Sequence, residues 1–476
     1  MASMSSNHAH GVSVTYSYDD LNRLTTVVDT RLAGNQTTTY SYDNASNVGK
    51  VTYPNGIATS FTYDLLNRVT GLSSTSTPAA SYTYQRGATG NLTQVVELSG
   101  RQVSWSYDGI YRLTQENIQD DQYGESGQVT YGLDPVGNRT SASSNVAGLS
   151  PVAGTTFGAG DPDDLLSGES YDANRNVIFT GGKSFTYDSE NHMMSMTAAG
   201  TSVTMLYDGD GNRVAKTVTA NGVPTTTYYL VDDLNPTGYP QVVEELAANG
   251  TVERQYTYGL QRIDEQQLIS NAWTPSFYGY DGGGNVRQLT NAAGGVTDSY
   301  EYDAFGNSFQ TSAPTSGPTP NNYLYRGEQY DPDLGLYYLR ARYYNPATGR
   351  FMSRDPEDGN RFDPATLHKY LYASGDPINA VDPTGRADYI ESVFTRTFVS
   401  APLELGVEGL VRLVAGGFAE LQRFSRVPSR HGLQPRRRPS RFRYGLSKRS
   451  QLFARRRQPS KEPKGQWNSF DLTRRT

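Results

Sequence analysis

The sequence VTYSYDDLNRLTTV at residues 14–27 decides the fold of this chain. Tyr16 and Tyr18 are separated by one polar residue, so their side chains lie on the same face of an extended strand. Asp19 and Asn22 follow directly, and such short polar side chains favour turns because they hydrogen-bond the local backbone and because Asn tolerates positive φ. A second run of alternating residues then begins. The stretch therefore predicts a strand, a tight turn and a second strand, which together form a β-hairpin.

The same unit recurs along the chain at a nearly constant period. Close copies are FTYDLLNRVTGL at residues 61–72 and FTYDSENHMMSM at residues 185–196. The Tyr-Asp pairs that we take as anchors of the repeat include Tyr18-Asp19, Tyr42-Asp43, Tyr63-Asp64 and Tyr302-Asp303. Successive tyrosines at positions 18, 42, 63, 84 and 107 are 24, 21, 21 and 23 residues apart. Such a period indicates a repeat architecture.

The repeat predicts an all-β fold. A single hairpin is not stable in water, so the copies are expected to pair edge to edge into a long antiparallel strip, which curls because sheets twist. Such a strip exposes its edge strands unless it winds on itself. The chain has 35 Tyr but 16 Phe, which suits a half-wet sheet face on which the ring packs and the hydroxyl group meets water.

Composition excludes several classes of protein. The 476 residues contain no Cys, which excludes a disulfide scaffold, a thiolate metal site and a thiol nucleophile. No apolar run reaches 18 residues, so we expect no membrane span. Residues 1–11 have no basic segment followed by an apolar one. If the protein is secreted or displayed at the cell surface, we therefore expect a non-standard export route, unless a signal was lost from its start.

Charge divides the chain into two parts. Residues 387–476 hold 19 of the 42 Lys and Arg but 7 of the 48 Asp and Glu, so this tail carries a net charge of +12 and the remainder −18. An acidic body and a basic tail attract each other and indicate two functional parts.

The stretch from Tyr325 onward narrows the interpretation. It reads YRGEQYDPDLGLYYLRARYYNPATGRFMSRDP, and YLYASGDPINAVDPTGR follows at residues 370–386. Together with the repeats, these segments resemble the RHS/YD-repeat family and its RHS repeat-associated core, over roughly residues 12–386. The closing signature of that core, Pro-x-x-x-x-Asp-Pro-x-Gly, is matched by Pro377, Asp382, Pro383 and Gly385.

The resemblance implies a partial β-shell and an activity. In similar proteins the hairpins spiral into a hollow shell, the core plugs one end, and an aspartyl-protease-like centre cuts the chain after the Asp-Pro-x-Gly motif. The released C-terminal segment is variable, is often a toxin, and stays inside the shell until delivery. The shell portion here is short, so it is a partial shell, a fragment, or half of a shell completed by a second chain. Arg386 stands where Leu is usual, and Asp363-Pro364 adds an extra Asp-Pro pair.

The resemblance assigns the catalytic carboxylates to Asp355 and Asp382. Two neighbouring carboxylates do not both ionise at low cost, so one keeps its proton and polarises the scissile carbonyl while the other activates water. Arg354 is expected to hold one of them ionised, and Asp363 and Asp376 are second choices. The alternative is that each Asp-Pro pair is only a turn. In that alternative the chain has no enzymatic activity. If the carboxylates are catalytic, the chain acts as a protease once, on itself. We expect no cofactor and no metal.

We expect five parts: a disordered start at residues 1–11, the shell at 12–310, the RHS-associated core at 311–386, a helical segment at 387–425 and a basic disordered tail at 426–476. Leu403, Val407 and Leu410 begin a series with helical spacing. Basic residues with interleaved Phe442 and Tyr444 weakly suggest nucleic acid.

Three functions stay open. The chain is a self-processing RHS shell that presents its own tail, a non-enzymatic surface protein for adhesion or carbohydrate binding, or a truncated remnant of a larger RHS protein. The partners would be the tail itself, a second shell-forming chain, secretion machinery or carbohydrate.

Overall fold

The computed structural model describes residues 3–31, 36–120, 126–147, 149, 164–312, 320–359, 364–386, 389–390 and 472–475. All of them belong to one compact unit, Met1–Ser400 with Phe470–Thr476. Its regular structure is antiparallel β-sheet with three 3₁₀ turns, η1 (Tyr325–Gly327), η2 (Pro364–Leu367) and η3 (Tyr372–Gly375). The predicted all-β architecture is confirmed. Among the described residues, no helix has the length and apolar character needed to cross a bilayer.

Sheet 1 contains fourteen strands, and all but the last pair with their neighbours in the sequence. In chain order they are β1 (Ser3–Ser6), β2 (Ser13–Tyr18), β3 (Leu24–Asp29), β4 (Gln36–Tyr42), β5 (Val48–Thr52), β6 (Ala58–Tyr63), β7 (Val69–Ser74), β8 (Ala80–Arg86), β9 (Leu92–Glu97), β10 (Gln102–Tyr107), β11 (Leu113–Gln119), β12 (Gly127–Leu133), β13 (Arg139–Ser144) and β34 (Leu472–Arg475), which pairs with β1.

Sheet 2 repeats the same meander with fourteen further strands. They are β14 (Ser170–Tyr171), β15 (Val177–Thr180), β16 (Lys183–Tyr187), β17 (Met193–Ala198), β18 (Thr201–Tyr207), β19 (Arg213–Ala220), β20 (Val223–Asp232), β21 (Gln241–Ala247), β22 (Val252–Tyr258), β23 (Arg262–Ile269), β24 (Ala272–Tyr280), β25 (Val286–Thr290), β26 (Val296–Tyr302) and β27 (Ser308–Ser312). The expected continuous strip is therefore two successive sheets in the described residues.

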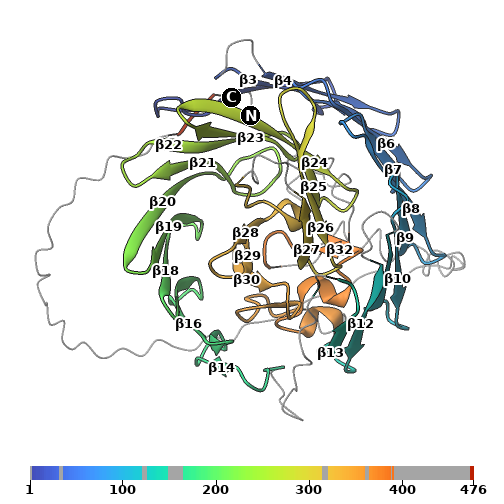
Figure 1. Ribbon diagram of the computed structural model, residues 1–476, viewed down its shortest axis with the longest axis vertical. Helices are drawn as coiled ribbons and strands as arrows, with labels where there is room; N and C mark the ends of the chain where they lie inside the picture. The colour runs from blue at the N-terminus through green and yellow to red at the C-terminus, as the bar shows by residue number, and fades with distance from the viewer. Residues whose placement is uncertain are drawn as a thin grey trace, which may run out of the picture. The chain divides into compact units, whose positions relative to one another are not determined.

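A small core region follows the two sheets. It contains β28 (Gln329–Asp331), β29 (Leu336–Leu339), β30 (Arg342–Asn345) and β31 (Arg350–Phe351) in one sheet, and β32 (Ala380–Val381) with β33 (Tyr389–Ile390) in another. In Figure 1 the strands of sheets 1 and 2 curve around β28–β30.

Buried polar contacts fix the core region to both sheets. Arg213 of sheet 2 pairs with Asp331 at 3.0 Å, and both side chains are almost fully buried. Arg350 donates to the amide oxygen of Asn138, which follows β12 of sheet 1, at 2.8 Å. Because removing one partner leaves a buried group unsatisfied, these contacts hold the core in one position.

In hairpins that carry a Tyr-Asp anchor, the aspartate of the pair closes the turn. Oδ1 of Asp19 accepts the backbone N–H groups of Leu21 and Arg23, at 3.0 and 2.9 Å. Asn22, between them, has φ +58°, a conformation that Asn tolerates. We call these five-residue turns the YD turns. Asp43, Asp64 and Asp303 accept the corresponding N–H groups of their own turns.

The tyrosine of the pair makes a contact that differs from the expectation. Its hydroxyl group was expected to meet water, but in most copies it donates to a backbone carbonyl of the preceding hairpin. Tyr42 donates to Leu24 and Tyr302 to Val286, at 2.6 and 3.0 Å. The acceptor begins the strand after the preceding YD turn. Because the tyrosine ring packs beside a strand of the preceding hairpin, the tyrosine hydroxyl group can reach the backbone of that strand. Tyr18, in the first hairpin, is 41% exposed.

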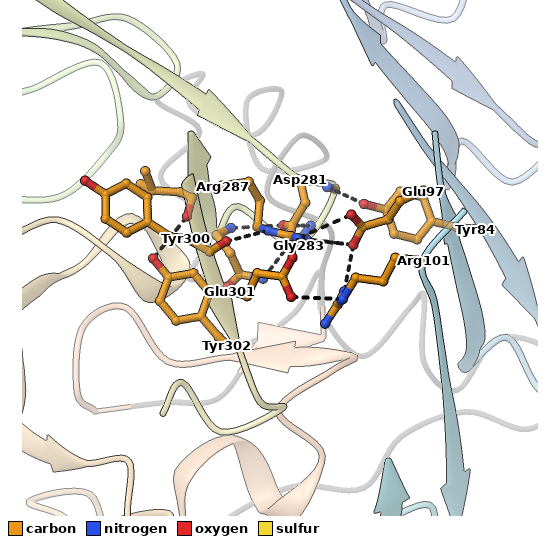
Figure 2. A network of polar contacts seen from close by, with 12 residues as sticks. Tyr84, Glu97, Arg101, Asp281, Gly283, Arg287, Tyr300, Glu301 and Tyr302 are labelled. Carbon is orange, nitrogen blue, oxygen red and sulfur yellow. Dashed lines mark hydrogen bonds and ion pairs between the residues drawn. The ribbon is translucent and has the colours of Figure 1, made fainter. Parts of the chain in front are cut away.

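A network of charged side chains joins the two sheets, as Figure 2 shows. Arg287 of β25 contacts Glu97 of β9 at 3.1 Å. Arg101 contacts the same carboxylate at 2.7 Å and Glu301 of β26 at 2.9 Å. All four side chains are at most 12% exposed. Ion pairs removed from water are little screened by salt, so this network holds the sheets in one arrangement.

Three expectations about the two ends of the chain need correction. The start at residues 1–11, expected to be disordered, contains β1. Tyr389–Ile390, expected to begin a helix, pairs with Ala380–Val381 as a strand because its backbone completes the edge of β32. Leu472–Arg475, expected to be disordered, is β34. The other residues of 387–425 and 426–476 lie outside the described residues.

Candidate active site

The candidate site is built from three short elements of the core region. Arg342 opens β30 and is followed directly by the buried residues Tyr343 and Tyr344. Asp355 follows β31, and its backbone N–H donates to the carbonyl oxygen of Lys369 at 2.9 Å. Asp382 follows β32 directly. The strand pairings of the core therefore bring together residues that are up to 40 positions apart in the chain.

One guanidinium group contacts both predicted carboxylates. Nη2 of Arg342 lies 2.9 Å from Oδ2 of Asp355 and 3.2 Å from Oδ2 of Asp382. The guanidinium also lies over the ring of Phe351, with Cζ 3.6 Å from the ring centroid. The side chains of Arg342 and Asp382 are at most 3% exposed, and that of Asp355 is 18% exposed. The site is thus a largely buried pair of carboxylates that share one cation.

The same groups hold the peptide unit that follows the Asp-Pro-Thr-Gly motif. The carbonyl oxygen of Gly385 accepts a hydrogen bond from Nε of Arg342. The backbone N–H of Arg386 donates to Oδ1 of Asp382 at 3.1 Å, and the hydroxyl group of Thr384 donates to the same oxygen at 3.2 Å. Both sides of the Gly385–Arg386 bond are therefore in contact with the charged centre.

Glycine is required at position 385. Its φ is +67°, and an added Cβ would lie 2.5 Å from the carbonyl oxygen of Leu339 and 2.9 Å from the backbone nitrogen of Arg342. Any larger residue would push the motif away from the strand that carries Arg342. The close approach of Gly385 to β30 is what allows the motif to reach the guanidinium group.

The carboxyl group of Asp355 has a higher pKa than an exposed aspartate. Burial raises its pKa above the ordinary value, although Arg342 and the N–H of Glu357 act in the opposite direction. Asp382 is 1% exposed and accepts hydrogen bonds from the N–H of Arg386 and from Arg342. The two carboxyl groups therefore differ in their exposure to solvent and in their hydrogen-bond partners.

The other predicted residues have separate positions. Arg354 is exposed, and the guanidinium group expected from it comes instead from Arg342. Asp376 is half-buried, accepts a hydrogen bond from Asn379 at 3.0 Å, and has a pKa that desolvation raises to about 6. Asn379 in turn donates to Tyr107 of sheet 1, so Asp376 belongs to the contact between core and shell. Asp363 lies outside the described residues.

The remaining motif residues support the backbone of this region. The carbonyl oxygen of Pro377 accepts from the guanidinium group of Arg326, and that of Pro383 accepts from Arg340. The side chain of Arg386 is exposed and lies 3.9 Å from Glu357. In the described part of the chain, no group of three or more His, Asp or Glu side chains is arranged to hold a metal ion.

Sequence reasoning missed Arg342. The available signal was a positive charge inside the aromatic segment YYLRARYYN at residues 337–345. A charged residue in a buried strand needs a partner, and the nearby Asp-Pro motifs supply two.

Comparison with known proteins supports the repeat on sequence grounds. The Teneurin YD-shell family model matches residues 3–118. The tRNA3(Ser)-specific nuclease WapA of Bacillus spizizenii is 34% identical over 286 residues, which cover 59% of this chain and 12% of that protein. The toxin protein Tse5 of Pseudomonas aeruginosa is 32% identical over 111 residues, which cover 23% of this chain and 8% of that protein. The chain therefore spans a small part of the length of these two relatives.

Solved structures share the fold. The crystal structure of TcdB2-TccC3-Cdc42 superposes with a TM-score of 0.65 at 18% identity, over 82% of this chain and 21% of that chain. The repeated tyrosine–aspartate hairpins, the Teneurin YD-shell model that matches residues 3–118 and the shared fold together show that this chain is built like the RHS/YD-repeat proteins it resembles.

Proposed function

We propose that this chain is the shell and core of an RHS-type toxin that presents the segment after Gly385 as cargo and cuts the chain once after the Asp-Pro-Thr-Gly motif. The observation that carries the proposal is the contact of Arg342 with Asp355, Asp382 and the Gly385 carbonyl oxygen. It joins a carboxylate pair to the peptide unit that the resemblance designates for cleavage.

The cut would proceed as a hydrolysis by two carboxyl groups. Asp382, as the charged carboxylate, takes a proton from a water molecule whose oxygen attacks the carbonyl carbon of Gly385. Arg342 and the protonated Asp355 stabilise the negative charge that develops on the carbonyl oxygen. The proton then passes from Asp382 to the nitrogen of Arg386, to which it is already hydrogen-bonded. The carbon–nitrogen bond breaks and leaves a carboxylic acid on Gly385 and an amine on Arg386; transfer of the acid proton to the amine gives the final carboxylate and ammonium group.

The names of the relatives support the toxin part of the proposal. WapA is a tRNA nuclease and Tse5 a toxin, although this chain matches only a small share of each. The cargo would be residues 387–476, delivered outside the producing cell by a non-standard route. A second shell-forming chain would complete the enclosure.

Intact mass spectrometry of the purified full chain tests the cut. The parent is expected to give two fragments separated after the motif, and the variants Asp355→Asn and Asp382→Asn are expected to give one intact mass. Asp358→Asn is the matched control, because Asp358 is exposed and close in sequence. An intact parent between pH 4 and 8, or an Asp382→Asn variant that is cut like the parent, would overturn the proposal.

The alternative of an uncut surface protein predicts a different result. A salivary gland surface protein of Aedes aegypti is 30% identical over 96 residues. For that function the purified parent stays whole, residues 3–386 bind glycans, and production of residues 387–476 inside bacteria does not slow their growth. A cut chain with a growth-inhibiting tail decides for the toxin.

A further inference from the structure

The strand β1 is paired on both of its sides. On one side it pairs with β2, with Ser3, Met4 and Ser5 opposite Thr15, Val14 and Ser13. On the other side it pairs with β34, and this register places Ser3, Met4, Ser5 and Ser6 opposite Arg475, Arg474, Thr473 and Leu472. Figure 1 shows the two ends of the chain close together. The strand that joins β1 comes from the tail, about 470 positions away in the sequence.

This pairing covers an edge that is otherwise open. Without β34, β1 is the first strand of sheet 1 and presents unpaired N–H and C=O groups. Such an edge is a template for any extended segment, because main-chain hydrogen bonds provide the attraction whatever the side chains. The tail therefore supplies the strand that sheet 1 lacks at this edge.

The edge is held rigidly by sheet 2. Glu244 of β21 is fully buried, and its carboxylate accepts the hydroxyl group of Ser6 and the ring nitrogen Nδ1 of His8, each at 2.5 Å, and the backbone N–H of Val12 at 2.6 Å. Met4 is 1% exposed. A strand fixed in this way needs little further ordering when it accepts a partner.

We infer that the outer edge of β1 is a docking site for the strand Leu472–Arg475 of this chain's own tail. The tail is then attached to the shell twice, through the peptide bond after Gly385 and through the strand pair at β1. Four paired residues bind weakly on their own, but the intervening chain keeps their effective concentration high. If the cut of the proposed function occurs, the strand pair becomes the attachment that remains, and its weakness sets the release of the tail.

The absence of Cys makes the pairing directly testable in the full chain. Antiparallel partners have Cα atoms about 4.5–5.5 Å apart, which suits a disulfide. Ser5→Cys with Thr473→Cys, a directly opposite pair, is expected to form an intramolecular disulfide under mild oxidation. Ser5→Cys with Leu472→Cys is the control, because a shift of one residue places the two positions on opposite faces. Peptide mapping without reduction identifies the linked peptides.

The outcomes separate this inference from the proposed cut. Equal yields in the two variants, or no link in either, would overturn the docking site whether or not the chain is cut. Links between two molecules would overturn it as well and assign the edge to a second copy. If the chain is cut, fragments that run together only without reduction confirm a double attachment.

Hydrogen exchange gives an independent measure without new cysteines. Thr473→Pro removes a backbone donor from β34, and Thr473→Ser keeps it. The amides of Ser3–Ser6 that face β34 are expected to exchange at least 10-fold faster in the proline variant than in the serine variant. Equal exchange in both variants would show that β34 does not protect β1.

Discussion

The hydroxyl group of Tyr63 donates a 2.9 Å hydrogen bond to the carbonyl oxygen of Val48, in the hairpin that precedes its own. Eight tyrosines of the repeat make the corresponding bond: Tyr42, Tyr63, Tyr107, Tyr187, Tyr207, Tyr258, Tyr280 and Tyr302. The tyrosine thus acts between repeats, whereas the aspartate beside it acts within one.

Tyr63→Phe is expected to loosen the contact between two neighbouring hairpins. The ring keeps its packing, but a partly buried carbonyl oxygen loses its donor, which costs about 1 kcal/mol. Hydrogen exchange of β5 and β6 should report this as a roughly fivefold faster opening. Tyr18→Phe is the control, because Tyr18 is 41% exposed. Equal effects of the two substitutions would contradict the role of the hydroxyl group.

Acid is expected to destabilise the YD turns. Burial acts to raise the pKa of Asp64, but hydrogen bonds from Arg68 and from the N–H of Leu66 outweigh it and lower the pKa. A carboxyl group whose pKa is lower in the folded chain stabilises the fold above its unfolded pKa of about 4 and loses that contribution as the pH falls further. The same direction holds for Asp19, Asp43, Asp108 and Asp188.

Thermal unfolding between pH 5 and 2 checks this expectation. The temperature midpoint of unfolding should decrease as the pH is lowered below 4. In Asp64→Asn this decrease should be shallower, because the amide side chain still accepts a hydrogen bond but does not titrate. A parent whose midpoint is constant down to pH 2 would contradict the turn model.

Arg287→Met is expected to weaken the contact between the two sheets. The substitution leaves Glu97 and Glu301 buried without one of their cations, and breaking a buried pair costs about 3–5 kcal/mol. A lower midpoint in urea unfolding measures the loss. Glu97→Gln in the same chain should recover part of it, because one uncompensated charge disappears. Glu253→Gln, at an exposed position, should change stability by less than about 0.5 kcal/mol.

Arg342→Lys is expected to slow the proposed cut strongly, whereas Arg354→Lys is not. Lysine keeps the charge, but it lacks the planar group that reaches Asp355, Asp382 and the Gly385 carbonyl oxygen at once. A loss of about 100-fold in the rate of fragment formation is expected for Arg342→Lys. Arg354 is exposed, so its variant should be cut like the parent. A strong effect of Arg354→Lys would restore the residue to the mechanism.

The hairpins could be predicted because their signals are local. Alternation around Tyr16 and Tyr18 defines a strand, and Asp19 with Asn22 defines the turn within five residues. The division into two sheets was not predictable, since the pattern that forms a hairpin does not state where the pairing of hairpins stops. The strand character of Leu472–Arg475 was hidden for the same reason, because it depends on an edge contributed from the other end of the chain.

The site was predictable only in part. The Asp-Pro motifs indicated Asp355 and Asp382, but either could equally have been a turn. Their juxtaposition depends on Arg342, whose place is set by strand pairing between β29 and β30. The choice of Arg354 followed from adjacency in sequence, and in an extended segment adjacent side chains point to opposite faces.

The hydrogen bond from the tyrosine hydroxyl group to the backbone also has a fixed direction along the chain. Every donor lies later in the chain than its acceptor, so a hairpin that leaves the ribosome finds the carbonyl group it needs already in place. The wall can therefore grow in the order of synthesis, one hairpin upon the last, with no need to wait for distant residues. The steps that do need distant residues come later in translation: contact between the two sheets, docking of the core and pairing of β34.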